Sequence, residues 1–255
     1  MSAKRERERR QAERMEAEQA AGGEERRRRL LQLGSAAVFL AIVVVAVLIV
    51  ISQTQTDGGD TNIEGTAEVK AELKGIPQRE LILGDPTAKV ELIEYGDLQC
   101  PVCKAFSEEI LPVAIRNQVR SGKAKLVFRN YPIIGSQSTP AGAAAIAAGA
   151  QGKGWAFIDL FYRNQGIEDS GYADDEFLTA IAKAAGVKDL ARWNRERKSP
   201  EATAQVERTN AQAQALEIEG TPTLQIKGPG VNGGSEVLPA PGSPEALEEL
   251  VENAA

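Results

Sequence analysis

The chain has 255 residues, of which 42% are hydrophobic and 26% are charged, so it can bury the core of one large domain or two small ones. The absence of histidine excludes Ser-His-Asp and Cys-His catalytic systems, and also zinc or haem sites ligated by histidine. Two cysteines are too few for a disulfide-rich scaffold or for a zinc site made of four thiolates. The net charge of −6 argues against a protein whose main task is to bind nucleic acid.

Charge is unevenly distributed, and the N-terminal segment is the basic part of the chain. Residues 1–29 contain ten Lys or Arg and seven Asp or Glu, and they end in four consecutive arginines. Such segments are most often solvated helix surfaces. We assign this one an orienting role at a membrane and, at most, contact with anionic lipid.

An uncharged segment follows and predicts a transmembrane helix at residues 30–52. Its apolar part, Leu30 to Ile51, has 22 residues, which at ~1.5 Å per residue span ~33 Å and cross a hydrocarbon core of ~30 Å. A buried helix of a soluble core is disfavoured because residues 38–51 lack a polar face. A cleaved signal peptide is disfavoured by the long charged segment before the span and the lack of a small-residue cleavage pattern after it. The arginines therefore place residues 1–29 in the cytoplasm and the remainder outside.

The rest of the chain predicts a linker and one folded domain. Residues 53–75 are polar and contain Gly58-Gly59, which is typical of an extracytoplasmic linker. The domain at 76–255 begins with a buried strand at 90–95 and a helix that starts at Pro101 and bends at Pro112. A second strand is expected at 125–131. A helical insertion at about 137–216 follows, then short strands at 223–226 and 237–238 and a final helix capped by Ser243.

Cys100 and Cys103 form a Cys-x-x-Cys motif at the predicted start of the first helix. This spacing permits a disulfide, and the free N–H groups and dipole of a helix N-terminus would stabilise a Cys100 thiolate. The thiolate is the nucleophile of thiol–disulfide exchange. A structural disulfide would also explain the motif, although so short a loop gives the least chain-entropy stabilisation. A zinc site shared with a second chain, or chance spacing, would explain it as well.

Three features together resemble the DsbA-like branch of the thioredoxin superfamily. They are Glu94-Tyr-Gly-Asp-Leu-Gln-Cys-Pro-Val-Cys, the distant Gly220-Thr-Pro-Thr, and the helical block between them. The resemblance covers about residues 84–254. It implies an α/β, thioredoxin-like fold with an inserted helical block, here preceded by one transmembrane helix.

The resemblance also implies roles for individual residues. Cys100 would be the exposed attacking thiol and Cys103 the buried resolving thiol. Pro222 would follow a cis peptide bond, and Thr221 would face the disulfide and pair through its backbone with an extended substrate, unless the bond forms an ordinary trans turn. Glu94 would be a buried carboxylate that helps to move the proton of Cys103, with a pKa raised by burial, unless it faces solvent on its strand.

Pro101 and Val102 lie between the cysteines, where they would tune the redox potential. Many strongly oxidising members of the family have histidine at the position of Val102, and its positive charge favours the thiolate. We therefore expect a less oxidising couple in this chain.

The predicted function is a membrane-anchored, extracytoplasmic thiol–disulfide oxidoreductase, acting as an oxidase on thiol-containing secreted or envelope proteins. The family implies a membrane oxidase that reoxidises the dithiol, and residues 30–52 would contact membrane lipid. No metal, organic cofactor or nucleic-acid partner is expected. Two competing functions are a reductase or isomerase of the same fold, and a non-catalytic, tethered peptide-binding module with a structural disulfide.

Overall fold

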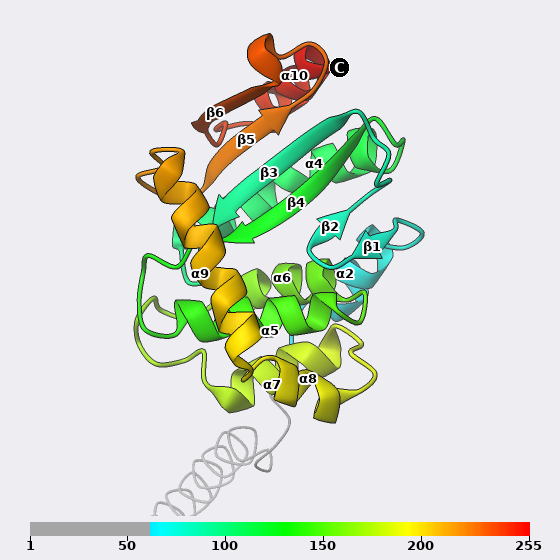
Figure 1. Cartoon of the computed structure of the whole chain (residues 1–255). Helices are drawn as coiled ribbons and strands as arrows, with labels where there is room; N and C mark the ends of the chain where they lie inside the picture. Colours follow the sequence, from blue (N-terminus) through cyan, green and yellow to red (C-terminus); the bar gives the residue numbers. More distant parts are fainter. Residues whose placement is uncertain (1–61) are drawn as a thin grey trace, which may run out of the picture. The chain divides into compact units, whose positions relative to one another are not determined.

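The computed structural model describes residues 62–255 (Figure 1). The charged segment at 1–29, the predicted span at 30–52 and the linker up to residue 61 lie outside the described residues. Within residues 62–255, no helix is both long enough and apolar enough to cross a membrane.

A six-stranded mixed sheet lies at the centre of the fold, with the strand order β1-β2-β4-β3-β5-β6. The strands β3 and β4 are parallel, and every other neighbouring pair in the sheet is antiparallel. The bounds of the strands are β1 Gln78–Arg79, β2 Ile82–Leu83, β3 Val90–Gly96, β4 Ala124–Asn130, β5 Thr223–Lys227 and β6 Ser235–Pro239. The three longer predicted strands are therefore confirmed, whereas the two-residue strands β1 and β2 were not expected.

A crossover helix joins the parallel strands β3 and β4. It consists of α3 Pro101–Ala105, the π-helical turn η1 Phe106–Ile110, α4 Leu111–Ala114 and the π-helical turn η2 Ile115–Val119. The helix does not end at Pro112, although proline has no N–H to offer the carbonyl four residues earlier. That carbonyl lies in the π-helical turn η1, which is where the regular hydrogen-bond pattern is interrupted.

Five helices form the block inserted between β4 and β5, which lies beside the sheet in Figure 1. They are α5 Ser138–Gly149, α6 Gly154–Arg163, α7 Asp175–Ala184, α8 Leu190–Glu196 and α9 Pro200–Ala215. The Ala- and Gly-rich α5 is almost entirely buried, because its small side chains allow close packing. Side chains of Asp174 and Ser199 cap α7 and α9, and Ser243 caps the final helix α10 Pro244–Ala254 as predicted.

The predicted linker is wrong for its last ten residues. Thr66–Glu72 form the helix α2, and Val69 is only 2% exposed. Val69, Leu73 and Ile76 belong to the main hydrophobic core, where α2 packs against α6. These three apolar residues lie on one side of the segment, which is enough to pack a short helix against the core. The polar residues between them made the segment resemble a linker.

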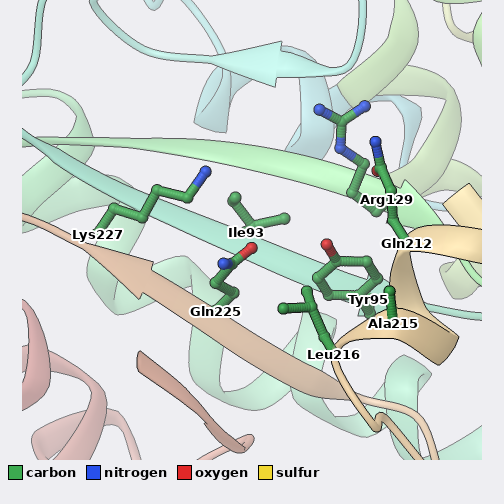
Figure 2. Close-up of a pocket in the computed structure, with 8 residues that line it drawn as sticks. All are labelled: Ile93, Tyr95, Arg129, Gln212, Ala215, Leu216, Gln225 and Lys227. Carbon is green, nitrogen blue, oxygen red and sulfur yellow. The ribbon is translucent and has the colours of Figure 1, made fainter. Parts of the chain in front are cut away.

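The two faces of β3 have different surroundings. Leu92 and Glu94 point to the face that packs in the main core, whereas Ile93 and Tyr95 point to the opposite face, where the end of α9 forms a second, smaller cluster. On that second face a pocket of about 340 Å³ remains open between the sheet and α9 (Figure 2). It is lined by Ile93, Tyr95, Arg129, Gln212, Ala215, Leu216, Gln225 and Lys227. The cysteines do not line this pocket.

Candidate active site

The two cysteines lie where β3 gives way to the crossover helix. Cys100 is the N-cap residue of α3, with an extended backbone (φ −75°, ψ 121°), and Pro101 occupies the first helical position. The Cys100 N–H donates to the carbonyl of Asp97 at 3.0 Å, and its own carbonyl accepts from the N–H of Lys104 at 3.1 Å. These bonds fix the main chain on both sides of Cys100, as expected for a helix start.

Both thiols are free, and they differ in accessibility. Cys103 is completely buried, as expected. Cys100 was expected to be exposed, and that expectation is wrong: its exposed fraction is only 4%. The loop before β5 covers it, since the Cys100 Sγ lies 3.5 Å from the Thr221 carbonyl, to which it donates. Val102, by contrast, is 62% exposed beside the pair.

Hydrogen bonds make Cys100 an acidic thiol in spite of its burial. The hydrogen bond from Cys103 is the strongest influence, and together with Thr221 and the backbone N–H groups of Cys103 and Val102 it lowers the pKa of Cys100 to about 6. Burial acts in the opposite direction. At neutral pH a thiol with this pKa is about 90% thiolate, compared with a few per cent for an ordinary cysteine. Val102 thus acts on the thiolate through its backbone.

Cys103 has the opposite character. Burial, the hydrogen bond that it makes to Cys100 and the charge of Glu94 raise the pKa of the Cys103 thiol far above its usual value. A pair with one acidic and one strongly basic sulfur has a defined polarity. Cys100 is the sulfur that carries negative charge, and Cys103 is the sulfur that keeps its proton.

Glu94 lies beneath this pair on the core face of β3. It is 3% exposed, and neither of its carboxyl oxygens has a hydrogen-bond partner. Burial, with a smaller effect from the charge of Cys100, raises the pKa of Glu94 to about 8. A Cβ atom at Gly96 would lie 2.9 Å from the Glu94 Oε1 and 3.2 Å from the Tyr162 hydroxyl, so glycine leaves room for both groups.

The Thr221–Pro222 peptide bond is cis, as predicted, and lies immediately before β5. This loop brings residues 121 positions apart in sequence into contact, since Thr221 touches Cys100. The Thr221 hydroxyl is buried and has no hydrogen-bond partner. The structure therefore brings Glu94, Cys100, Cys103 and Thr221 together, with Pro101 and Val102 at the surface.

Residues 97–100, between β3 and α3, form the active-site loop, and the polar residues that hold it in place were not predicted from the sequence. Asp97 is fully buried, and its carboxylate accepts the backbone N–H groups of Gln99, Ile133 and Ile134 at 2.8 to 2.9 Å. The sequence did contain a signal for Asp97, because it lies between β3 and the cysteines. A carboxylate that is buried there needs several hydrogen-bond donors around it. Tyr162, whose hydroxyl donates to the Asp97 carbonyl at 3.2 Å, had no signal in sequence.

No cluster of three or more metal-ligating side chains occurs in residues 62–255. The site instead consists of two thiols of opposite acidity, a buried carboxyl group and a cis-proline loop. On a thioredoxin-like α/β fold, this arrangement defines a thiol–disulfide oxidoreductase.

Comparisons with known proteins identify the family. The thioredoxin family model matches residues 77–253. The probable disulfide bond formation protein D of Bacillus cereus is 30% identical over 149 residues, which are 57% of this chain and 69% of that protein. The chain therefore belongs to the thioredoxin family, in its DsbA-like branch of thiol–disulfide oxidoreductases.

Solved structures show the same fold. Oxidised BdbD from Bacillus subtilis superimposes with a TM-score of 0.61 at 21% identity, covering 70% of this chain and 97% of that chain. A thioredoxin-like oxidoreductase from Silicibacter pomeroyi gives a TM-score of 0.55 at 26% identity, covering 72% and 96%. The helical insertion is thus shared with these proteins, although their sequences have diverged widely.

Proposed function

We propose that the protein is a membrane-anchored, extracytoplasmic oxidase that introduces disulfide bonds into exported proteins. The observation that carries this proposal is the opposite acidity of the two sulfurs: the pKa of Cys100 is lowered to about 6, while that of Cys103 is strongly raised. A stabilised Cys100 thiolate favours the reduced enzyme over its disulfide, and this makes the disulfide a better oxidant. The Bacillus relatives named for disulfide bond formation support the same direction.

The reaction begins from the Cys100–Cys103 disulfide. A substrate thiolate attacks the Cys100 Sγ, a mixed disulfide forms, and the bond to Cys103 breaks. A second substrate thiolate then attacks the substrate sulfur of the mixed disulfide and displaces Cys100 as a thiolate. The substrate loses two electrons and gains a disulfide, and the enzyme is left as a dithiol.

Glu94 is the proton donor to Cys103 in this scheme. Cys103 leaves as a thiolate in a fully buried position, where an uncompensated charge is costly. A carboxyl group with a pKa of about 8 is largely protonated at neutral pH and can supply the proton. In the reverse direction, during reoxidation, the Glu94 carboxylate takes the same proton back.

The substrate is an extended, partly apolar segment that binds across the Thr221–Pro222 loop. Four large hydrophobic residues are exposed in residues 62–255, and three of them border the active-site loop: Val102, Ile133 and Ile167. Ile133 lies next to the active-site loop because its N–H donates to the Asp97 carboxylate. Ile167 lies in the α6–α7 loop, which contacts the active-site loop through the hydrogen bond from the Asp169 N–H to Gln99. Apolar surface of this kind suits unfolded polypeptide, in which such side chains have not yet been buried.

Regeneration requires an electron acceptor, for which we propose a membrane oxidase linked to quinone. Residues 30–52 would keep the enzyme at the membrane, with residues 1–29 in the cytoplasm and the domain outside. Extraction of membranes with alkaline carbonate tests the anchor. The full-length chain should stay in the pellet, and its release into the supernatant would contradict the anchor.

Alkylation of the reduced protein by iodoacetamide at a series of pH values tests the proposed chemistry. The native dithiol protein reports on Cys100, because Cys103 is completely buried, and a Cys100→Ser variant isolates Cys103 as the matched control. The rate for Cys100 should rise with a midpoint well below that of an ordinary thiol, whereas Cys103 should react very slowly. An ordinary Cys100 midpoint of ~8.5 would contradict the activated-thiol mechanism.

A further inference from the structure

The side chain of Gln165, in the helical insertion, forms hydrogen bonds with two main-chain carbonyls next to the reactive thiol. Gln165 lies just beyond the end of α6 at Arg163. Its amide Nε2 donates to the carbonyl of Leu98 at 2.7 Å and to the carbonyl of Cys100 at 3.2 Å. Gln165 itself is held in place because its backbone N–H donates to the carbonyl of Tyr162 at 3.1 Å.

A second glutamine, Gln99, links the active-site loop to the helical insertion through its own side chain. Gln99, which is fully buried between Leu98 and Cys100, donates through Nε2 to the Ser138 hydroxyl at 2.9 Å. Its Oε1 accepts the Asp169 N–H at 3.3 Å. The loop that carries Cys100 is therefore fastened to the start of α5 and to the loop after α6.

We propose that Gln165 is a positioning residue for Cys100, through which the helical insertion holds the reactive thiol in its working geometry. The Cys100 carbonyl accepts from both Lys104 N–H and Gln165, so the peptide at the helix start has no freedom to turn. That orientation keeps the N–H groups of Val102 and Cys103 directed at the Cys100 sulfur. The proposal rests on the proposed role of Cys100 as the sulfur that substrates attack.

Two kinds of substitution test this role: removal of the donor, and addition of a charge of either sign. Gln165→Glu would place a carboxylate against two carbonyl oxygens and close to the thiolate, whereas Gln165→Lys would keep a donor there and add a positive charge. Gln165→Met, of similar shape, removes the donor without adding charge. The titratable groups that face Cys100 are Glu94 on β3, Cys103 on α3 and Tyr162 on α6, and all three are unchanged in these variants.

The experiment measures the pH dependence of Cys100 alkylation for each variant in the reduced protein with native Cys103, which keeps the hydrogen bond from Cys103 to Cys100. A unit charge at the Gln165 side chain, whose amide lies 3.2 Å from the Cys100 carbonyl oxygen, should shift the midpoint by about one unit, upward for Gln165→Glu and downward for Gln165→Lys. Near pH 6, an upward shift of this size slows alkylation about fivefold. Gln165→Met should shift the midpoint upward by less than Gln165→Glu.

Gln151→Glu is the matched control. The side-chain amide of Gln151 also makes two hydrogen bonds to main chain within the helical insertion: it donates to the Asp189 carbonyl at 2.9 Å and accepts from the Asp189 N–H at 3.0 Å. It does not contact the active-site loop. The variant should leave the midpoint unchanged. If Gln165→Met, which removes the donor without adding charge, left the Cys100 midpoint unchanged, the positioning role would be refuted. An ordinary midpoint in the protein with native Gln165 would instead refute the proposed function itself, so the two failures are distinguishable.

Discussion

Replacing Glu94 with glutamine should change how the stability of the reduced protein depends on pH. In the folded protein the pKa of Glu94 is raised from 4.5 to about 8, chiefly because the carboxyl group is buried. Between these values the folded state keeps a proton that the unfolded state has released, so the contribution of Glu94 to stability falls as pH rises. The fall is about 1.4 kcal/mol per pH unit, or roughly 4 kcal/mol between about pH 5 and pH 8.

The Glu94→Gln variant lacks this titration, so its free energy of unfolding should lose roughly 4 kcal/mol less over the same range. Glutamine brings an amide into a site without hydrogen-bond partners, which costs about 1–3 kcal/mol at every pH and does not affect the slope. Urea unfolding at several pH values, with reductant present, gives the comparison. Glu109→Gln, at an exposed position on the crossover helix, is the matched control. Parallel curves for the native protein and Glu94→Gln would refute the account of Glu94 as a buried, protonated carboxyl group.

Three further substitutions test the site. In Cys103→Ser, the Cys100 thiolate should attack a disulfide of an oxidised substrate protein and release one substrate thiolate, and the mixed disulfide should persist because no Cys103 thiol is present to resolve it. It would be visible on non-reducing gels as bands that reductant removes, and Cys100→Ser should give none. Thr221→Val removes a hydroxyl that stabilises the thiolate, so the alkylation midpoint of Cys100 should rise, and an unchanged midpoint would show that this hydroxyl has no such role. Gly96→Ala would bring a Cβ within 2.8 Å of Phe128, so thermal unfolding should show a loss of about 1–3 kcal/mol, and an unchanged stability would contradict the tight packing there.

Sequence patterns predicted the elements with strong, local signals. Period-2 and period-3.6 hydrophobicity indicated the long strands and most helices, and the capping residue Ser243 marked the start of the final helix. The helix α2 was not predicted, because Val69, Leu73 and Ile76 are the only large apolar residues that anchor it. The strands β1 and β2 were not predicted either, because two-residue strands have no periodicity to detect.

The part of the candidate site that could be predicted consists of reactive residues that are close together in the sequence. Cys100 and Cys103 were found in this way, and the cis bond before Pro222 came from resemblance. The low exposure of Cys100 was not predictable, since it depends on the contact with Thr221 across 121 residues. The role that we propose for Gln165 likewise depends on a tertiary contact, because nothing in the local sequence relates it to Cys100.

The reduction potential of the Cys100–Cys103 pair tests the central claim most directly. The full-length protein would be equilibrated with glutathione buffers of known ratio, and the dithiol fraction measured by alkylation and mass spectrometry. A stabilised Cys100 thiolate predicts a potential well above that of thioredoxin at ~−270 mV, and the absence of histidine at Val102 predicts one below the ~−120 mV of DsbA. A value at or below ~−270 mV would contradict the proposed oxidase.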